Sequence, residues 1–342
     1  MKNLPTEKIS FEPPGDRTKK LWLVTGGCGF IGKNLAARLL EGGEIKVRVL
    51  DNLSAGSEKD LFSARPRGDD LELFRGDIRD FMDCYESSSG AGTVIHLAAT
   101  AGVSQSVQSL FDDMQTNIAG TLNMLEAARV AEVKKFVFAS AGALSGGARP
   151  PVYEGPAPEP VSPYGASKLA GEGYCRAYAR TFGLSAVALR FGNVYGPGCA
   201  HKHSVVAGFF RNALNGAPLV ISGDGNQTRD FIYMDDIIRA ILLAAKTPFA
   251  AGVFQVATRR ETSINELALA VGRLVEKRTG IKTTLRFGKP QPGDIRRNHS
   301  NISMARTMPG FEPLVSLDEG LDKTLEYFLR EYGLFRGRKW VV

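Results

Sequence analysis

The sequence predicts an α/β protein built on a doubly wound parallel sheet, with a smaller C-terminal α/β part. From Leu21 onward, short apolar runs alternate with longer amphipathic segments. The first run leads into the glycine-rich stretch TGGCGFIG. Parallel strands need crossover helices and are buried on both faces, which produces this alternation of apolar runs and helices.

The elements are expected in the following order. Strands are predicted at residues 21–27, 47–52, 71–77, 93–99, 135–141 and 185–196, and helices from Phe30, near Ser57, up to Val130 and from Ser162. Shorter, less regular elements follow. The stretch RPPVYEGPAPEPVSP is too proline-rich for a helix or central strand, so we expect a loop beside the carboxyl edge of the sheet.

Composition excludes several classes of protein. The 342 residues are 43% hydrophobic and 23% charged, which suits a folded core rather than global disorder. The net charge of +7 is spread along the chain, which favours small anions slightly and does not indicate nucleic acid. Four cysteines and four histidines show no metal-ligand spacing. We expect reduced thiols in a cytoplasmic protein, because neither a signal peptide nor a membrane span is visible.

The glycine-rich stretch predicts dinucleotide binding. Gly26, Gly29 and Gly32 follow a strand and open a helix, where backbone amides can approach a pyrophosphate. Asp51 comes 19 residues after Gly32, where a carboxylate meets the adenosine ribose. Since Asn52 rather than arginine comes next, NAD is favoured over NADP. An ordinary tight turn is the alternative.

The pattern of elements also predicts the domain organisation. We expect an extension over 1–19, a Rossmann-like NAD-binding domain over 20–190 and a partly interleaved, mostly substrate-binding domain over 191–342.

A second motif, SPYGASKLAGE, predicts an acid/base pair. Ser162 can cap a helix with Pro163 at its first position, so Tyr164 and Lys168 lie one turn apart on one face. A phenol is a poor base at neutral pH unless a neighbouring ammonium favours the phenolate. The alternative is a helix with an exposed Tyr and Lys. The preceding strand, which ends near Ser140, favours the catalytic interpretation.

With these motifs the chain resembles the extended short-chain dehydrogenase/reductase family. The resemblance runs from about Leu21 to Arg306 and rests on TGGCGFIG, DNLSAG, GDIRD, HLAA, NIAGTLNMLEAAR, YGASK, RFGNVYGPG and GDGNQTRDFIYMDD. Within the family it is most similar to bacterial nucleotide-sugar 4-epimerases acting on UDP-glucose or UDP-N-acetylglucosamine. The resemblance implies that tyrosinate removes the 4-hydroxyl proton while C4 passes hydride to NAD⁺, and that the keto sugar turns over and takes the hydride back.

The resemblance also implies site residues. It assigns three catalytic side chains: Tyr164, Lys168 and Ser140. Around NAD it places Gly26, Gly29, Phe30, Ile31, Gly32, Asp51, Asn52, Ser54, Asp77, Ile78, Leu97, Ala98, Ala99, Asn117 and Lys168. Around the nucleotide sugar it places Ser106, Ala141, Tyr164, Asn193, Ser204, Val205, Leu219, Ile221, Arg229 and Asn298. Arg229 is the expected diphosphate clamp, because a guanidinium matches phosphate oxygens. The alternative for Arg229 is a surface cation.

Five further side chains are expected to have structural or solvated roles. Asp230 and Asp235 are interpreted as structural acceptors for backbone amides. His96 lies in an apolar strand and is interpreted as a core histidine. His201 and His203 lie in a loop near the expected sugar site, where solvated loop residues are the alternative.

The strand end FASAGALSGG departs from the family pattern. Ala141 stands where relatives place the hydroxyl that bonds the sugar 4-hydroxyl, and we expect a roughly ten- to thousandfold slower reaction unless Ser140 or Ser145 compensates. Gly142 and Ala143 exclude the related 4,6-dehydratases and decarboxylases, which need carboxylates there.

Two departures concern the substrate. Gln291 replaces a usual diphosphate-binding arginine, so Arg296 or Arg297 is expected to help Arg229. Asn298 stands where a bulky tyrosine restricts relatives to UDP-glucose, which predicts tolerance of N-acetylhexosamines.

Other functions stay open from the sequence. The chain could bind NAD and nucleotide sugar without turnover, or act as a one-way sugar-nucleotide oxidoreductase. Helices near 107–130 and 163–182 correspond to those that form a dimer interface in the family, so we expect a homodimer.

Overall fold

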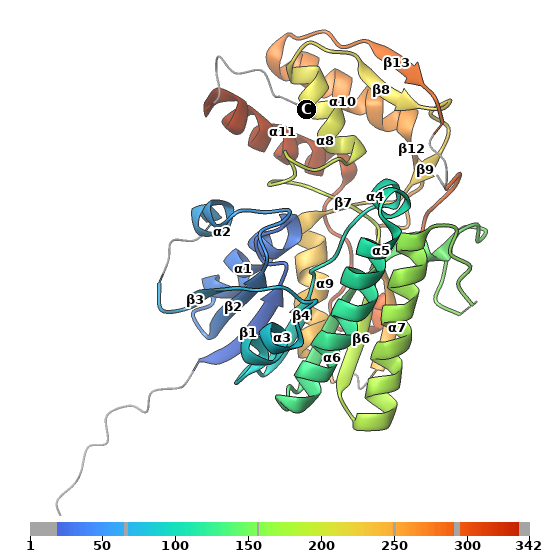
Figure 1. The fold of residues 1–342 in the computed structure, drawn as a ribbon. Coiled ribbons are helices and arrows are strands. Elements are labelled where there is room, and N and C mark those ends of the chain that lie inside the picture. Colours follow the sequence, from blue (N-terminus) through green and yellow to red (C-terminus); the bar gives the residue numbers. More distant parts are fainter. Residues whose placement is uncertain (1–18, 65–67, 156, 249–250, 291–294, 335–342) are drawn as a thin grey trace, which may run out of the picture.

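The computed structural model describes residues 19–64, 68–155, 157–248, 251–290 and 295–334. Its centre is a parallel sheet of seven strands in the order β11-β6-β5-β4-β1-β2-β3 (Figure 1). The strands are β1 Lys20–Thr25, β2 Ile45–Asp51, β3 Leu71–Arg75, β4 Thr93–His96, β5 Lys135–Ala141, β6 Ser185–Phe191 and β11 Ala251–Val256. The prediction of a doubly wound parallel sheet is confirmed.

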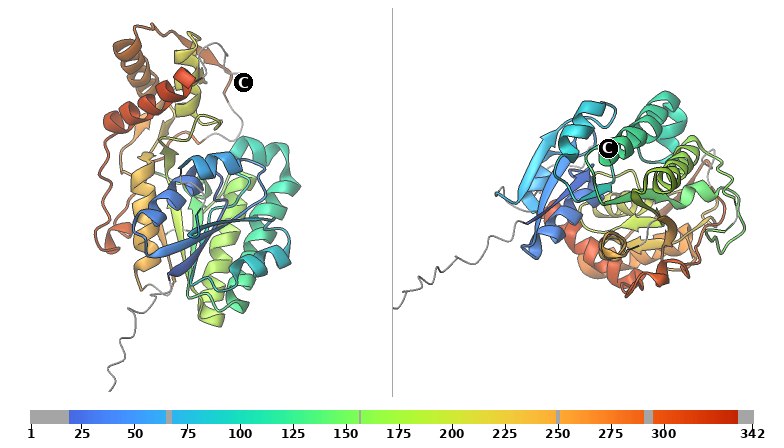
Figure 2. Two further views of the ribbon diagram at one scale, coloured as in Figure 1. Left: turned by 90° about the vertical axis from the view of Figure 1, so that its left-hand side faces the viewer. Right: turned by 90° about the horizontal axis from the view of Figure 1, so that it is seen from below.

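Alternate residues of each central strand enter two different cores. Val24 of β1 packs with α1 (Phe30–Glu41) and α9 (Met234–Lys246), whereas Leu23 packs with α6 (Gly120–Val130) and α7 (Pro163–Phe182). Successive strand residues point to opposite faces, so a run that is apolar at every position can fill both layers. The two helical layers flank the sheet in Figure 2. Two shorter helices, α2 (Glu58–Ala64) and α3 (Phe81–Ser88), complete the crossovers.

The chain returns to the sheet after leaving it. β11 pairs with β6 in parallel, and α9 covers the same face as α1. The sheet therefore includes residues from well beyond position 190.

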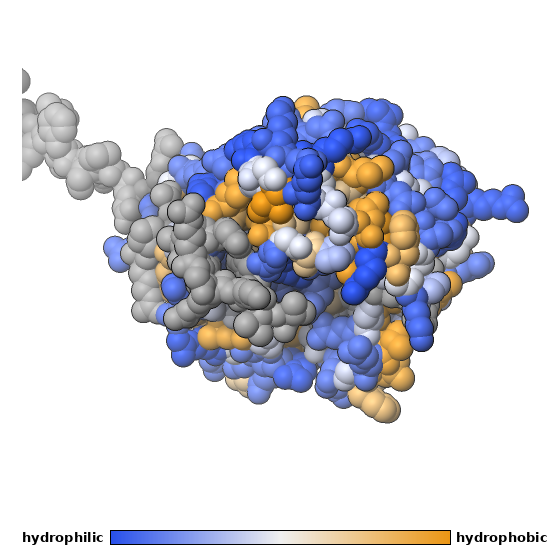
Figure 3. Space-filling model, turned by 90° about the horizontal axis from the view of Figure 1, so that it is seen from above, coloured by the Kyte–Doolittle hydropathy of each residue, from blue (hydrophilic) through white to orange (hydrophobic). Residues whose placement is uncertain are grey.

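A separate core lies above the carboxyl edge of the sheet. Helices α8 (Val205–Leu214), α10 (Ile264–Thr279) and α11 (Leu317–Leu334) bury it together with β8 (Leu219–Ser222), which pairs with β13 (Leu285–Gly288). Helix α10 begins with a capping box formed by Ser263 and Glu266. The outer face of this part is hydrophilic with separate apolar patches (Figure 3).

Two short pairs of strands connect this part to the sheet. β7 (Asn193–Tyr195) pairs in parallel with β10 (Phe231–Tyr233), and β9 (Thr228–Arg229) pairs with β12 (Thr262–Ser263).

The helix expected up to Val130 is broken. It consists of α4 (Val103–Gln108), α5 (Leu110–Asp113), a π-helical turn at Met114–Ala119 and α6. Ser109 has φ −140° and ψ 77°, and this extended backbone ends α4. The π turn that follows α5 adds one residue to a helical turn and so changes which side chains face the sheet.

The proline-rich stretch forms no helix among its described residues before Pro163, which is the first residue of α7, and it carries one isolated bridge, between Val152 and Ser300. No helix of the described residues is long and apolar enough to cross a membrane.

Candidate active site

The carboxyl ends of the parallel strands meet at one edge of the sheet. This edge carries the glycine loop after β1, Asp51 at the end of β2, Leu97 after β4 and Ala141 at the end of β5. Ligands of open parallel sheets bind at such an edge, near the point where the strand order reverses. Here the order reverses between β1 and β4.

Steric packing requires glycine at two positions of the loop. Gly26 has φ +68°, and a Cβ there would lie 2.8 Å from the Ala98 nitrogen. A Cβ on Gly32 would lie 2.3 Å from the Gly26 carbonyl oxygen. Gly29 precedes α1 as its N-cap and offers no side-chain acceptor, so the first amide groups of the helix face the loop without a capping side chain. Such a loop offers backbone amides and the positive helix end to a pyrophosphate. Phe30 and Ile31, in the first turn, are half-buried.

Asp51 is tied to the glycine loop. Its carboxylate accepts hydrogen bonds from the Cys28 amide at 2.9 Å and the Leu53 amide at 2.8 Å. Beside it, the Asn52 amide donates to Asp77 at 2.9 Å. Hydrogen bonds from Arg79 lower the pKa of Asp77 to about 2. Ser54 is exposed nearby. The contact between Asn52 and Asp77 brings the two predicted carboxylates, Asp51 and Asp77, to the same part of the sheet edge.

The predicted cofactor residues that follow β3 and β4 are half-buried or buried. Ala98 donates its amide to the Thr25 hydroxyl at 3.1 Å, and Leu97 and Ala99 are half-buried. Ile78 is 5% exposed and packs in the core against Gly120. Its side chain therefore lies behind the expected cofactor site and not at its surface.

Tyr164 and Lys168 lie together in the first turns of α7. Ser162 caps this helix by accepting from the Gly165 amide at 3.1 Å. The Lys168 ammonium lies 5.8 Å from the Tyr164 ring centroid and 4.9 Å from that of Phe138. Burial, and after it the charge of Asp113, raises the pKa of the Tyr164 phenol to about 12. Burial also lowers the pKa of Lys168 to about 8.

Asn117 is a fully buried junction between the sheet edge and α7. Its side-chain oxygen accepts from the Thr100 amide at 2.9 Å, and its amide group donates to the Thr100 carbonyl at 2.9 Å. The same group donates to Asp113 at 2.8 Å and to the Ser167 hydroxyl at 3.3 Å. The π turn brings Asn117 into this position. The sequence does not single out Asp113, because a carboxylate in an amphipathic segment is expected on the solvent-exposed face of the helix.

The catalytic role predicted for Ser140 does not fit the structure. Its hydroxyl donates to Glu172 at 2.6 Å, and Glu172 forms a two-pronged ion pair with Arg190 at 2.7 and 2.8 Å. Ser140 is 3% exposed and both charged side chains are 4% exposed. Because residues alternate along β5, Ser140 points into this buried network while Ala141 takes the other direction. Ser140 therefore anchors α7 instead of replacing the missing hydroxyl.

The space after β5 is bounded by small residues. A Cβ on Gly142 would lie 3.4 Å from the Asn298 side-chain nitrogen, so Asn298 approaches the end of β5. Ser145 is 5% exposed, and its hydroxyl has no hydrogen-bond partner among the described residues. The structure thus brings Asn298, predicted from the distant C-terminal part, close to Gly142 at the end of β5.

The predicted diphosphate clamp is preorganised. The Arg229 guanidinium donates at 2.6 Å to the carbonyls of Thr228 and Ile295. The expected helpers are engaged elsewhere: Arg296 pairs with Asp224 and Arg297 with Glu261. Both pairs lie at the surface, so Arg296 or Arg297 would have to exchange its carboxylate partner to help bind a diphosphate. Gln291 lies outside the described residues.

Three further residues predicted near the nucleotide sugar have fully buried side chains. Leu219 and Ile221 are fully buried in the core around α8 and α10, because alternate residues of β8 face that core. Ser106 is fully buried as well, and its hydroxyl donates to the Val103 carbonyl at 2.8 Å. Asn193 is exposed on β7, while Ser204 and Val205 are half-buried at the start of α8.

The structural roles expected for two residues are confirmed. Asp230 accepts from the amides of Thr258, Arg259 and Ser300. His96 contacts the hydroxyls of Thr25 at 2.7 Å and Thr121 at 3.0 Å, and burial lowers its pKa to about 3.

For Asp235 the prediction fails, since Asp235 is exposed and Asp236 instead accepts from the Leu314 and Val315 amides. His201 and His203 are exposed in their loop.

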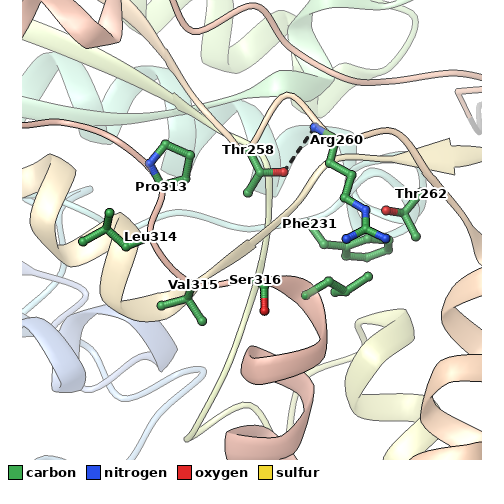
Figure 4. Close-up of a pocket in the computed structure, with 9 residues that line it drawn as sticks. Phe231, Thr258, Arg260, Thr262, Pro313, Leu314, Val315 and Ser316 are labelled. Atoms are coloured by element: carbon green, nitrogen blue, oxygen red, sulfur yellow. Dashed lines mark hydrogen bonds between the residues drawn. The ribbon is translucent and has the colours of Figure 1, made fainter.

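One cavity, of about 260 Å³, lies beside the strand pairs that contain Asn193 and Arg229 (Figure 4). It is lined by Phe231, Thr258, Arg260, Thr262 and residues 313–317. It contains none of the side chains predicted to bind cofactor or sugar. The described residues hold no cluster of three potential metal ligands.

Comparison with known proteins identifies the family. Residues 22–257 match the model of the NAD dependent epimerase/dehydratase family. The chain belongs to this family. It is 37% identical to a UDP-glucose 4-epimerase from Mycolicibacterium smegmatis over 90% of this chain and 97% of the relative. The predicted family is confirmed, and NAD is the cofactor of the family.

Two solved structures of family members resemble the whole fold. A UDP-N-acetylglucosamine 4-epimerase from Methanobrevibacter ruminantium, in complex with UDP-N-acetylmuramic acid, gives a TM-score of 0.84 at 33% identity and covers 92% of this chain and 99% of that one. A Thermus thermophilus UDP-glucose 4-epimerase in complex with NAD gives 0.81 at 34% identity, with 90% and 99% covered.

The glycine cradle fits the cofactor of this family. A side chain at Gly26 or Gly32 would collide with the backbone of residues 97–98 or 26–27, so the tight loop depends on these glycines, and the uncapped start of α1 leaves amide donors for the pyrophosphate. Asp51 is positioned to receive the adenosine ribose, because its carboxylate is oriented by two loop amides.

Proposed function

We propose that this protein is an NAD-dependent nucleotide-sugar 4-epimerase, which interconverts gluco and galacto configured UDP-hexoses through a transient 4-keto sugar. The observation that carries the proposal is the Tyr164–Lys168 pair on α7, in which Lys168 is buried and Tyr164 half-buried, beside the carboxyl edge that holds the glycine cradle. The names of the relatives support the same activity.

In the proposed reaction, Tyr164 takes the proton from the sugar 4-hydroxyl and later returns it. NAD⁺, when bound, accepts a hydride from C4 and gives it back. The phenol of Tyr164 must lose its proton first, which burial opposes and the Lys168 ammonium favours. The small residues Ala141, Gly142 and Ala143 leave room for the keto sugar to turn over, as epimerisation requires.

We also propose that N-acetylhexosamines are accepted. Asn298 approaches Gly142 at the end of β5, where a bulkier side chain would narrow the space. The Methanobrevibacter epimerase, named for UDP-N-acetylglucosamine, supports this. If the protein turns over UDP-glucose but not UDP-N-acetylglucosamine, the proposal is wrong.

The test is incubation of the NAD-loaded protein with UDP-glucose and with UDP-N-acetylglucosamine, followed by NMR of the sugar H4 and anomeric protons. We expect the galacto isomer to appear, and Tyr164→Phe to abolish it. Ala141→Ser should raise the rate about tenfold or more, by restoring a hydrogen bond in the transition state.

A binding protein without turnover is the second candidate, because Ala141 lacks the hydroxyl and Ser140 is engaged with Glu172. Silence of both the wild type and Ala141→Ser would favour it. Exchange of bound NAD for free NAD during turnover would instead indicate a one-way oxidoreductase.

We further propose a homodimer formed through α4, α5 and α7. Val107, Leu110 and Phe111 are 53%, 55% and 79% exposed on consecutive turns, and exposed apolar clusters mark interfaces. Phe111→Glu should yield a monomer in light scattering, whereas the equally apolar Phe287→Glu should not. A wild-type monomer at micromolar concentration would contradict this. All four cysteines are free thiols, which supports the proposal of a cytoplasmic location.

A further inference from the structure

A buried carboxylate lies behind the catalytic pair. Asp113 ends α5 and is only 2% exposed, whereas its neighbour Asp112 is exposed and bonded to the Ser109 hydroxyl at 2.5 Å. Within the described part of the chain, no lysine or arginine forms an ion pair with Asp113. An unpaired buried acid is unfavourable for folding and so invites a functional explanation.

Asp113 is joined to the catalytic turn of α7 by hydrogen bonds. Its carboxylate accepts from the Asn117 amide at 2.8 Å, and Asn117 donates to the Ser167 hydroxyl at 3.3 Å. Ser167 in turn donates to the Tyr164 carbonyl at 3.0 Å. Ser167 and Asn117 are 1% and 0% exposed, so water cannot easily replace these contacts.

The other ionisable groups near the pair carry no negative charge or have it compensated. Burial raises the pKa of Cys175 and lowers that of His96 to about 3, so both are neutral at neutral pH. Glu172 is paired with Arg190 at 2.7 Å. Among the described residues, Asp113 is the one carboxylate whose charge acts on both Tyr164 and Lys168.

We propose that Asp113 is a positioning residue of the reaction: its carboxylate holds the Asn117 amide against α7 and places a negative charge behind the phenol of Tyr164 and the ammonium of Lys168. This inference rests on the proposed acid/base role of Tyr164. A negative charge here disfavours phenolate and favours the protonated lysine, and it thereby sets the pH range in which the pair works. The charge lowers the phenolate fraction at neutral pH while it keeps Lys168 protonated.

The test is the pH dependence of kcat for Asp113→Asn. Removing the charge should move the acidic limb to lower pH by about one pH unit, the usual scale of the effect of a neighbouring charge. Asp113→Glu keeps the charge and should keep the wild-type limb, and the exposed Asp112→Asn is the matched control on the same helix. An unchanged limb in Asp113→Asn, or a shift to higher pH, would overturn the proposal.

A second measurement does not depend on turnover. Phenolate absorbance of the NAD⁺-loaded protein, after subtraction of the same titration of Tyr164→Phe, reports the ionisation of Tyr164. It should occur at lower pH in Asp113→Asn than in the wild type, even if no sugar is epimerised. A shifted phenol without epimerisation would leave this inference standing and refute the proposed function. If Asp113→Asn does not fold, Asp113→Ser removes the charge with a smaller side chain, and an unshifted phenol there would also overturn the proposal.

Discussion

The carboxyl edge of the sheet and the C-terminal part above it differ in how their predicted site residues are used. At the edge, Gly26, Asp51 and the Tyr164–Lys168 pair lie together, as expected from short motifs. In the C-terminal part, Leu219 and Ile221 face a core, and Arg296 and Arg297 are held by carboxylates.

The difference has a physical cause. Residues one helical turn apart, or in one tight turn, have geometry set by the local backbone, so their spacing predicts their arrangement. In a short strand such as β8, the side that is buried depends on which neighbouring element packs against it. A surface cation can pair with a substrate or with a nearby carboxylate, and local spacing does not distinguish them.

The largest expected effect tests the edge directly. Tyr164→Phe removes the acid/base group and should lower kcat by about 10²- to 10⁴-fold, with NAD binding unchanged. Tyr174→Phe, on the same helix and 37% exposed, is the control and should keep wild-type kcat. Steady-state kinetics with UDP-glucose measure both. Equal losses in the two variants would show that the effect comes from disturbing α7 and not from removing the Tyr164 hydroxyl.

The next effect sharpens the comparison within the C-terminal part. Arg229→Met should raise KM for the nucleotide sugar by roughly ten- to a hundredfold, the range of a lost charge-assisted hydrogen bond or two. Arg296→Met should change KM less than about threefold, because Arg296 is exposed and paired with Asp224. If both variants raise KM equally, the assignment of a single clamp is wrong.

Cofactor binding should weaken at alkaline pH. Burial lowers the pKa of Lys168 to about 8, so its ammonium is present below that pH and lost above it. If only the protonated form binds NAD well, the Kd should be about tenfold higher at pH 9 than at pH 7. Calorimetry at the two pH values checks this, and Lys168→Met should bind weakly at both. A wild-type Kd that is independent of pH would exclude Lys168 from the cofactor site.

The smallest expected effect on activity concerns Ser140. Ser140→Ala removes a hydrogen bond to a buried carboxylate and should lower the free energy of unfolding by about 1.5–3 kcal/mol. We expect kcat to change only a few-fold, and the exposed Ser63→Ala to change stability by less than about 0.5 kcal/mol. Denaturant unfolding and kinetics give both values. A large loss of kcat without loss of stability would return Ser140 to the sugar site.

The sequence by itself determined the sheet, the glycine loop and the Tyr164–Lys168 pair. In each case the signal is local: a continuous apolar run for each strand, a spacing of one helical turn for the pair, and a tight turn for the glycine loop. It also shows that residue 141 is an alanine and has no hydroxyl, because the identity of a residue can be read without a structure.

Only the tertiary structure decided which polar groups share a site. It placed Ser140 on Glu172, Asn298 beside Gly142 and Asp113 behind the catalytic pair. The break of the helix before Val130 into a π turn, which carries Asn117 to Thr100, has the same origin. These contacts join segments from 4 to more than 150 positions apart, and burial decides their partners, because a buried polar group must find one wherever the chain brings it.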